Sequence, residues 1–316
     1  NIKNNQILIR TNLSLISAGT EKMLLEFGKS NYLEKASKQP AKVKEVMNKI
    51  TNDGLKSTLE AVKSKLEDPI SMGYCNVGIV EKVGDDIQDF KPGDRVISNG
   101  PHAELCVVSK NLCAKVPNDV TDEQAVFTVL SSIALQSTRL ANVNFGETTL
   151  VIGLGLIGLI TVQFLKAAGC DVYGIDPDES KVDLANSLGV QSLASKDKNQ
   201  IIQWCKDKSN NFGMDAVIIS ASTKSNDPIS IAANVSRKRG KIVLSGVSGL
   251  DLNREEFYNK ELSFQVSCSY GPGRYDKSYE KDGIDYPIGF VRWTEKRNFE
   301  SVLSSFSKGK LDISKL

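Results

Sequence analysis

The N-terminal third of the chain alternates apolar and polar side chains over short stretches. Residues 6–16 keep this alternation and predict one strand or a bent pair of strands, whereas residues 17–22 break it and predict a turn. Gly78 interrupts a later apolar stretch and predicts a bulge or the close approach of a neighbouring backbone. Apolar residues with helical spacing predict two helices, over 43–50 and 55–66. Residues 90–96 predict a turn followed by a strand, and further short strands are expected over residues 73–84, 103–108 and 112–116.

Helices and strands alternate through the rest of the chain. A helical stretch begins at Thr121 and continues to Leu140, and a short apolar run at 150–152 follows it. This order predicts a doubly wound parallel sheet beside the β-rich first region. Further helices are expected up to Ala168 and over residues 179–188, 228–238 and 298–306, and further strands before Asp176 and over 216–220, 241–245 and 264–269.

Three glycines lie between the first strand and the first helix of this alternation. Gly153, Gly155 and Gly158 have the spacing Gly-x-Gly-x-x-Gly, which in this context is the fingerprint of a dinucleotide site. Gly153 permits the tight turn, Gly155 lets the backbone approach a pyrophosphate, and Gly158 lets the helix pack closely on the strand. Unpaired N–H groups of Leu156 and Ile157 at the helix start would then face the phosphates.

Asp176 ends the second strand, about 20 residues after the glycine turn. There it is placed to accept hydrogen bonds from a ribose diol, and its charge would repel a 2′-phosphate, so NAD is favoured over NADP. The alternative is that Asp176 caps the following helix. Residues at the same sheet edge are expected to complete the cofactor site: Lys181, Ser220, Ala221, Gly246 and Val247.

Composition and charge narrow the classes of function. The 316 residues are 40% hydrophobic and 25% charged, which suits a soluble chain of about two domains. Lys and Arg number 40 against 38 Asp and Glu, a net charge of +2, so nothing indicates a nucleic-acid or membrane surface. No apolar run approaches the length of a membrane span, and no signal peptide is evident, so we expect a cytoplasmic protein. The chain starts without Met and both ends look clipped.

Two further features bear on chemistry. The six cysteines lie in apolar runs without Cys-x-x-Cys spacing, which predicts buried thiols in a reducing compartment rather than disulfides or a zinc lobe. The stretches 270–276 and 285–295 are rich in Gly, Pro and aromatic residues. Such loops usually line or cover a site, and plain structural packing is the alternative.

Taken together, these motifs resemble the medium-chain dehydrogenase/reductase superfamily, the relatives of alcohol dehydrogenase. The resemblance covers nearly the whole chain and rests on Gly19-Thr20-Glu21, Gly93-Asp94-Arg95-Val96, Phe145-Gly146-Glu147 and the glycine fingerprint. More narrowly, the stretches NLSLISAGTEK, SYGPGRYD and DYPIGFVRWTE look like the bi-domain oxidoreductases. That resemblance implies a GroES-like catalytic domain, a Rossmann NAD-binding domain and a second, fused or partner, oxidoreductase domain.

The chain departs from the zinc-dependent members of that family. Where those relatives carry a Cys, a His and a third Cys, this chain has Ala18, Tyr74 followed by Cys75, and about Thr128. These positions cannot supply the thiolate and imidazole ligands that zinc prefers, and the four-cysteine structural zinc cluster is also missing. We therefore expect no metal.

Three side chains are candidates for the chemistry that zinc would otherwise support. Thr20 occupies the place of the family's proton-relay hydroxyl, and Tyr74 replaces a metal-binding His and is a candidate acid. His102, the only histidine, is a candidate for proton exchange at neutral pH. Each has a purely structural alternative: a turn hydroxyl for Thr20, packing for Tyr74 and an exposed or structural role for His102.

Other residues are expected at the substrate and the nicotinamide. By resemblance, Glu21 matches the family's acid behind the metal and is expected to anchor Lys22, Arg95 or backbone. Arg274 and Tyr275 are expected at the substrate, Arg274 as a grip for an anionic or carbonyl group or, alternatively, in a structural ion pair. Cys268 and Tyr270 align with the backbone that binds the nicotinamide carboxamide in relatives.

The predicted function is a zinc-independent, NAD-dependent oxidoreductase acting on an alcohol or ketone of a small polar substrate, such as a sugar. One alternative is a quinone or enoyl reductase using NAD(P)H, and another is a non-catalytic NAD-binding module of a larger protein. The expected organisation is a catalytic domain over 1–125 with a helical insert near 29–68, an NAD-binding domain over 126–267, and a truncated return segment over 268–316. The resemblance suggests a homodimer.

Overall fold

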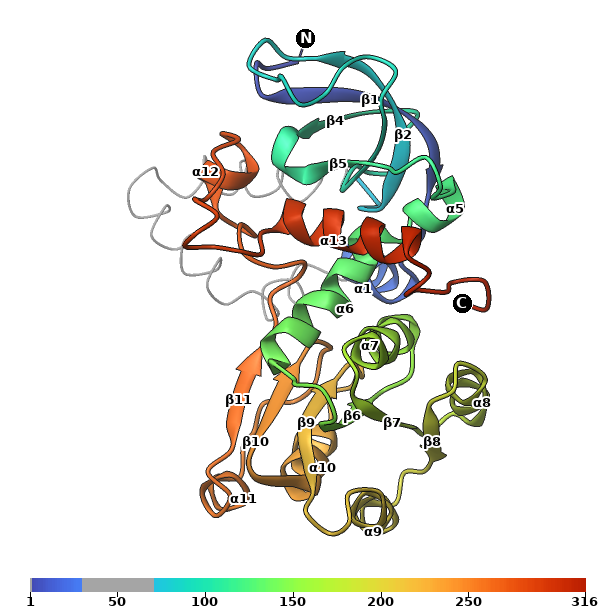
Figure 1. The fold of residues 1–316 in the computed structure, drawn as a ribbon, viewed down its shortest axis with the longest axis vertical. Helices are drawn as coiled ribbons and strands as arrows, with labels where there is room; N and C mark the ends of the chain where they lie inside the picture. Colours follow the sequence, from blue (N-terminus) through green and yellow to red (C-terminus); the bar gives the residue numbers. More distant parts are fainter. Residues whose placement is uncertain (1, 30–70) are drawn as a thin grey trace.

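The computed structural model describes residues 2–29 and 71–316. The insert predicted near 29–68, with its helices at 43–50 and 55–66, lies outside these residues apart from Lys29. Within the described ranges, no helix is both long and apolar enough to span a bilayer. The predicted fold class is confirmed, because an antiparallel sheet and a parallel sheet form the two ends of the molecule in Figure 1.

The N-terminal sheet has the strand order β4-β1-β2-β3-β5, and every neighbouring pair is antiparallel. Its strands are β1 (Gln6–Ser14), β2 (Asn76–Val83), β3 (Arg95–Ser98), β4 (Leu105–Ser109) and β5 (Cys113–Lys115). Alternate residues such as Ile7, Ile9 and Val80 fill its core. The alternation in the sequence therefore gave the correct strands.

Gly78 allows β1 and β2 to approach closely. A Cβ atom on Gly78 would lie 2.1 Å from the carbonyl oxygen of Arg10, a distance at which atoms overlap. The pairing of the two strands also shifts its register between Thr11 and Leu13, opposite this glycine. The predicted close backbone approach and irregularity at Gly78 are both confirmed.

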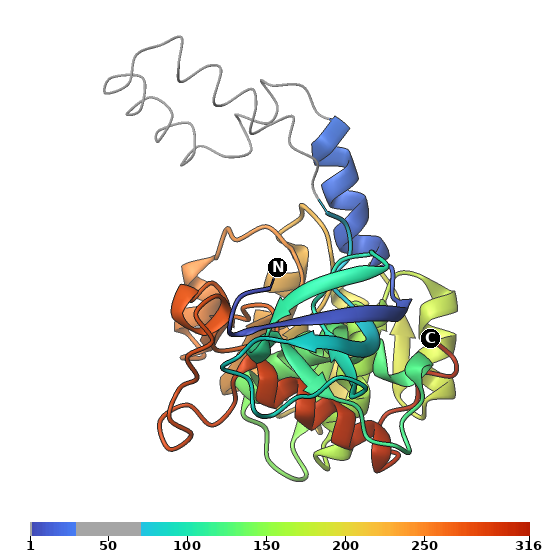
Figure 2. The ribbon, with the colours of Figure 1, turned by 90° about the horizontal axis from the view of Figure 1, so that it is seen from above.

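The turn predicted at residues 17–22 is wrong, because helix α1 (Ala18–Lys29) begins there. The Ser17 N–H donates to Glu21 Oε1 at 2.8 Å, and Glu21 N–H donates to the Ser17 carbonyl at 2.9 Å. This reciprocal pair starts a helix, so Gly19-Thr20-Glu21 forms its first turn. Figure 2 shows α1 running outward from the N-terminal sheet.

The second sheet has the order β11-β10-β9-β6-β7-β8, and all of its neighbouring strands are parallel. The strands are β6 (Thr148–Ile152), β7 (Asp171–Asp176), β8 (Gln191–Ala194), β9 (Met214–Ile219), β10 (Ser236–Leu244) and β11 (Ser263–Val266). The helices that follow them are α7 (Leu156–Ala167), α8 (Glu179–Ser187), α9 (Lys198–Lys208), α10 (Asp227–Val235) and α11 (Arg254–Tyr258). Two apolar clusters fill the opposite faces of this sheet.

The sequence analysis did not predict β8, α9 or α11. It also did not predict a short helix after β11, α12 (Lys277–Glu280). None has a strong apolar pattern, because β8 is only partly buried and α9 contains mostly polar side chains. Asp197 and Asn253 accept hydrogen bonds from the first turns of α9 and α11, so local capping starts them.

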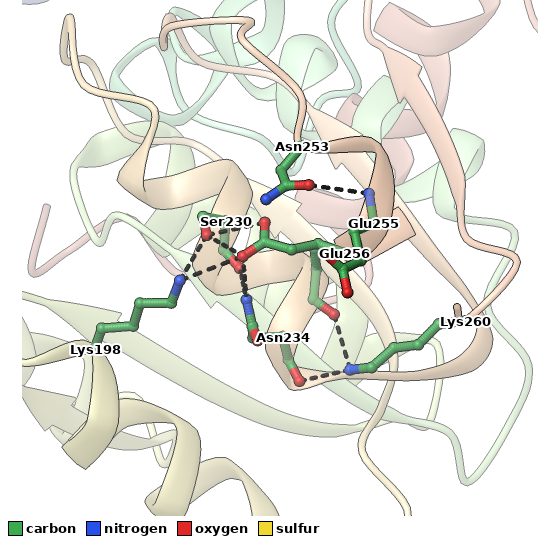
Figure 3. Close-up of polar contacts among 8 residues, drawn as sticks. Lys198, Ser230, Asn234, Asn253, Glu255, Glu256 and Lys260 are labelled. Atoms are coloured by element: carbon green, nitrogen blue, oxygen red, sulfur yellow. Dashed lines mark hydrogen bonds and ion pairs between the residues drawn. The ribbon is translucent and has the colours of Figure 1, made fainter. Parts of the chain in front are cut away.

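A satisfied polar network joins α9, α10 and α11 (Figure 3). Glu256 accepts hydrogen bonds from Ser230 and Asn234, at 2.7 and 2.8 Å, and lies 3.4 Å from Lys198 Nζ. Lys260 donates to the carbonyls of residues 233, 234 and 236. These carbonyls lie at the C-terminal end of α10, where the negative end of the helix dipole favours a cation. All these groups are paired with one another, so the network holds helices together and leaves little for a ligand.

Two helices connect the sheets. The helix expected from Thr121 to Leu140 is divided into α5 (Asp122–Ala125) and α6 (Thr128–Ala141). The last helix, α13 (Glu295–Ser307), packs on α6 and on β5, and Figure 1 shows both helices between the two sheets. After β11 the chain returns to the N-terminal side, where α13 packs on β5. The predicted domain boundaries, including the return segment after 268, stay predictions.

Candidate functional site

The glycine turn has the geometry that each glycine was predicted to provide. Gly153 has φ +93°, and a Cβ there would meet the Ala221 backbone at 2.6 Å. A Cβ on Gly158 would lie 1.9 Å from the Gly153 carbonyl oxygen, so α7 can pack on the turn only without that atom. A Cβ on Gly155 would meet nothing within 4 Å. The space beside Gly155, where a phosphate group would approach, is thus open.

The N-terminus of α7 opens onto that space. Gly155 is the N-cap residue and provides no side chain to satisfy the first turn of the helix. In the described part of the chain, no backbone carbonyl accepts a hydrogen bond from the N–H groups of Leu156 or Ile157. Unpaired donors at the positive end of a helix dipole form an anion site. A pyrophosphate therefore fits this turn.

Asp176 holds the turn against the end of β7. Its Oδ2 accepts from the Leu154 N–H at 2.8 Å, and its Oδ1 accepts from the Asp178 N–H at 2.9 Å. The helix-cap alternative for Asp176 is wrong, because Asp178 caps α8 through the Ser180 N–H. Each carboxylate oxygen keeps a further lone pair for a hydroxyl donor. Lys181 Nζ lies 3.7 Å from Asp176, so this cation borders the same carboxylate.

The ends of β9 and β10 form the next part of this edge. Gly246 packs against Ala221, since a Cβ on Gly246 would lie 2.1 Å from the Ala221 carbonyl oxygen. The Val247 N–H donates to that same oxygen at 3.0 Å, while the Val247 side chain is exposed. Among the described residues nothing pairs with the buried hydroxyl of Ser220. The edge therefore offers mainly backbone and the exposed Val247 side chain to a ligand.

Tyr74 lies in a second cluster, which comes from the N-terminal half of the chain. Its phenol donates to Ser17 Oγ at 2.7 Å and lies 3.4 Å from Thr20 Oγ1. Burial raises the pKa of the Tyr74 phenol, and the hydrogen bonds with Ser17 and Thr20 oppose the shift only in part. Tyr74 is therefore a neutral hydrogen-bond donor at neutral pH, and Thr20 is an exposed hydroxyl beside it.

His102 belongs to the same cluster through Glu21. His102 Nε2 lies 3.1 Å from Glu21 Oε2, and His102 Nδ1 lies 2.9 Å from Ser14 Oγ. The imidazole also packs on Gly73, where a Cβ would come within 2.7 Å of the ring. Both ring nitrogens are engaged, so His102 orients Glu21. The carboxylate anchors His102 and the Ser17 backbone, not Lys22 or Arg95.

Ser17 is the member of this cluster that the sequence analysis missed. It is buried, accepts the Tyr74 hydrogen bond and starts the helix that presents Thr20 and Glu21. Its signal in the sequence was a serine four residues before a glutamate, which is close to the spacing of a helix-capping box. We overlooked it because the segment was interpreted as a turn.

The two clusters border one apolar core. Tyr270 is part of that core, and Tyr74, Leu156 and Ile157 pack against it. The tyrosine cluster and the start of α7 thus pack against the same extended core, although they are about 80 residues apart in the chain.

The residues at the family's zinc positions do not suit zinc. Ala18 has no ligand atom, and Thr128 provides a buried hydroxyl without a partner among the described residues. Burial raises the pKa of the Cys75 thiol to about 12, so the thiolate that zinc needs is disfavoured. In residues 2–29 and 71–316, no three His, Cys, Asp or Glu side chains gather in a way that could hold a metal ion.

The segment after β11 differs from expectation in two ways. Cys268 is exposed, so the prediction that all six thiols are buried is wrong for this one, while the other five are buried. Arg274 forms an ion pair with Glu280, which is the structural alternative that the sequence left open. Tyr275 is exposed, and the Arg274 guanidinium carbon lies 4.2 Å from the centroid of its ring.

Tyr270 and Glu295 form the buried side of this segment. Burial raises the pKa of the Tyr270 phenol to about 12, and the Asn99 side-chain amide lies 3.4 Å from its hydroxyl. Glu295 is fully buried, and among the described residues neither of its oxygens has a hydrogen-bond partner. Burial, and then the nearby Glu280, raise the pKa of Glu295 to about 9. No sequence pattern indicated this neutral carboxyl group, because an acid near a helix start usually faces solvent.

Two family models match the chain. Residues 43–126 match the alcohol dehydrogenase GroES-like domain, and residues 157–281 match the zinc-binding dehydrogenase domain. D-guloside 3-dehydrogenase from Escherichia coli is 27% identical over 255 residues, which are 78% of this chain and 68% of that protein. Probable D-xylulose reductase A from Neosartorya fischeri is 22% identical over 246 residues, 66% of this chain and 69% of that protein.

Solved structures share the fold. The crystal structure of galactitol-1-phosphate dehydrogenase from Escherichia coli has a TM-score of 0.72 and 18% sequence identity to this chain. The match covers 100% of this chain and 86% of that one.

Proposed function

Because the chain belongs to the medium-chain dehydrogenase/reductase superfamily and is an alcohol oxidoreductase of that family, we propose that it transfers hydride between NAD and a sugar or sugar derivative. The observation that carries the proposal is the open glycine turn beside Asp176, together with a hydroxyl cluster around Tyr74 that packs against the same core as the start of α7. Dehydrogenases of this family use nicotinamide cofactors, and the edge described above suits a dinucleotide.

Under this proposal, Leu156 and Ile157 donate their N–H groups to the pyrophosphate and Asp176 accepts a ribose hydroxyl. The Asp176 carboxylate disfavours a 2′-phosphate, which supports NAD over NADP. Lys181 opposes this preference, but it already faces two carboxylates, Asp176 and Asp178. When bound, the nicotinamide supplies or accepts the hydride.

The hydroxyl cluster holds the substrate oxygen and handles its proton. In the reducing direction, the carbonyl carbon takes the hydride and the oxygen takes a proton. Tyr74 is the proposed donor of that proton: its phenol is protonated at neutral pH, would turn its O–H from Ser17 Oγ to the substrate oxygen, and would regain a proton from solvent after the transfer. Thr20 donates a second hydrogen bond to the same oxygen under this proposal. Ser17 fixes the phenol, and His102 holds Glu21 so that the first turn of α1 keeps its position. His102 thus has a positioning role in this proposal.

Two observations support zinc independence and the substrate class. Ala18, Tyr74 and Thr128 stand where zinc ligands are found in relatives, and their chemistry does not suit the metal. The relatives named above act on a guloside and on xylulose, as their names state, which supports a sugar as the substrate.

We also propose a cytoplasmic homodimer paired through the outer edge of β11, since that strand pairs only with β10 among the described strands. A second oxidoreductase domain, fused or separate, completes the proposal.

The test is a comparison of cofactors and substrates with the purified protein. We expect NADH to bind at least about tenfold more tightly than NADPH in a fluorescence titration. We expect NAD-dependent oxidation of some members of a panel of glycosides and polyols, and no loss of activity after dialysis against a zinc chelator. Preferred NADPH with turnover of enones would favour a quinone or enoyl reductase. Tight NADH binding with no turnover of any substrate would favour a non-catalytic binding module.

A further inference from the structure

His102 connects a carboxylate to a serine hydroxyl. Its Nε2 lies 3.1 Å from Glu21 Oε2, and its Nδ1 lies 2.9 Å from Ser14 Oγ. A carboxylate oxygen only accepts hydrogen bonds, so Nε2 carries the imidazole proton, and Nδ1 has the lone pair that accepts the Ser14 O–H. The three side chains therefore follow the order acid, imidazole, hydroxyl, which is the arrangement that activates a serine as a nucleophile.

Three separate parts of the chain bring these side chains together. Ser14 ends β1, Glu21 lies in the first turn of α1, and His102 lies between β3 and β4. The His102 N–H donates to the Met72 carbonyl at 2.7 Å, and its ring packs on Gly73. Because both the backbone and the ring of His102 are held, the imidazole is already in place to take a proton from the hydroxyl.

The acid end of this series is buried, and the hydroxyl end is accessible. The Glu21 side chain is 8% exposed and the His102 side chain is 24% exposed, while Ser14 is half-buried. The second oxygen of Glu21 accepts from the Ser17 N–H at 2.8 Å, so the carboxylate is fixed at both oxygens. A buried, fixed acid orients the imidazole, and the partly exposed hydroxyl is the group that a substrate can reach.

Asn76 provides a neutral donor beside Ser14. The two residues are paired across β1 and β2, and paired residues of antiparallel strands have Cβ atoms about 5 Å apart on the same face. Asn76 Nδ2 donates to Thr11 Oγ1 at 2.6 Å and to no other described residue, so its second N–H remains. A side-chain amide next to a nucleophile can bind the negative oxygen that forms during acyl transfer.

We propose that Ser14 is a nucleophile and that the protein hydrolyses small carboxylic esters through it. Ser14 Oγ attacks the ester carbonyl carbon while its proton passes to His102 Nδ1, and the electron pair of the carbonyl bond moves to the oxygen that Asn76 binds. The electron pair then returns, the bond to the alkoxy oxygen breaks, and the alkoxy group takes the proton from Nδ1 and leaves as an alcohol. Water releases the carboxylic acid from acyl-Ser14 in the same way, with Nδ1 again as the base.

No oxidation or reduction occurs in these steps, so the proposal does not depend on the proposed function. The test uses the full chain without nicotinamide. With 4-nitrophenyl acetate we expect release of 4-nitrophenolate, and a fluorophosphonate probe should attach to Ser14 in peptide mapping by mass spectrometry. Ser14→Ala removes the nucleophile and His102→Gln removes the base, so each should lower the rate of hydrolysis at least about 100-fold.

Ser307→Ala is the matched control, because Ser307 Oγ donates to the Asp119 carboxylate at 2.5 Å without an imidazole between them. This variant should hydrolyse the ester at the parent's rate and keep the label on Ser14. Ser14→Ala should melt within about 4 °C of the parent, which separates lost chemistry from lost structure. Labelling of the parent gives an answer even if a variant does not fold. A probe attached to another residue, no labelling at all, or hydrolysis by Ser14→Ala at the parent's rate would overturn the proposal.

Discussion

The glycine edge and the tyrosine cluster are built in different ways. The edge is made of backbone. A side chain at Gly153 or Gly158 would overlap neighbouring backbone atoms, and the Asp176 carboxylate accepts hydrogen bonds from two backbone N–H groups. The tyrosine cluster is made of side chains from β1, α1 and the segment before β2, joined by hydroxyl, carboxylate and imidazole contacts. Backbone sites tolerate few substitutions, whereas a side-chain cluster can change its chemistry while the fold stays the same. We expect that the family's zinc positions have changed here, whereas the glycine spacing of the dinucleotide fingerprint is kept.

The sharpest way to break this comparison is to add one methyl group to the edge. Gly158→Ala places a Cβ 1.9 Å from the Gly153 carbonyl oxygen, so the turn or α7 must move. We expect a loss of several kcal/mol of stability, or no folded protein, because the clash is with backbone. Gly155→Ala is the matched control, since its Cβ meets nothing within 4 Å. It should melt within about 2 °C of the parent and still lose NADH binding by about tenfold or more. Normal NADH binding by Gly155→Ala would contradict the phosphate site.

A second substitution separates the cluster from the edge. Tyr74→Phe removes the proposed proton donor and should lower kcat by about 100-fold, while the Kd for NADH stays within about twofold. Tyr258→Phe, on an exposed ring of α11, is the control and should change neither value. A kcat that remains unchanged in Tyr74→Phe would show that the phenol only packs.

Asp176→Ala tests the carboxylate at the edge. We expect the Kd for NADH to rise about tenfold, since a ribose contact is lost together with two hydrogen bonds that hold the turn. The Kd for NADPH should rise less, because the repulsion of the 2′-phosphate is removed as well. Asp178→Ala, which uncaps α8 without touching the turn, serves as the comparison. Equal weakening of both cofactors by Asp176→Ala would mean that the residue has only a structural role.

The smallest expected effect concerns Glu295 and pH. Burial raises its folded-state pKa from the ordinary 4.5 to about 9, so the folded protein holds one proton more than the unfolded chain between these values. Stability from this group therefore falls as the pH rises through that window. Glu295→Gln should raise the melting temperature by about 5 °C at pH 8 and by much less at pH 5. Glu123 is exposed, so Glu123→Gln is the control and should change the melting temperature equally little at both pH values. An equal rise in the melting temperature of Glu295→Gln at pH 5 and pH 8 would contradict a neutral Glu295 carboxyl group in the folded protein.

The sequence predicted the two regions to different degrees, for a physical reason. The glycine turn, Asp176 and most strands follow local rules of backbone conformation and apolar spacing, and these were found in the expected places. The partners of Tyr74 and His102 depend on how distant segments pack. Ser17 was missed because the start of α1 depends on its pairing with Glu21, and Glu295 was missed because burial of an acid leaves no pattern in the sequence. Resemblance brought Thr20 and Tyr74 to attention, but it did not indicate their contacts.

The double anchoring of Asp176 has an entropic consequence. A free aspartate at a binding edge would lose rotational freedom when a ligand arrives, and that loss would weaken binding. Here two backbone N–H groups already hold the carboxylate at 2.8 and 2.9 Å. Its conformational entropy is lost once, during folding, and not again at each turnover. If the edge binds cofactor as proposed, it can exchange that cofactor many times without reordering the Asp176 side chain.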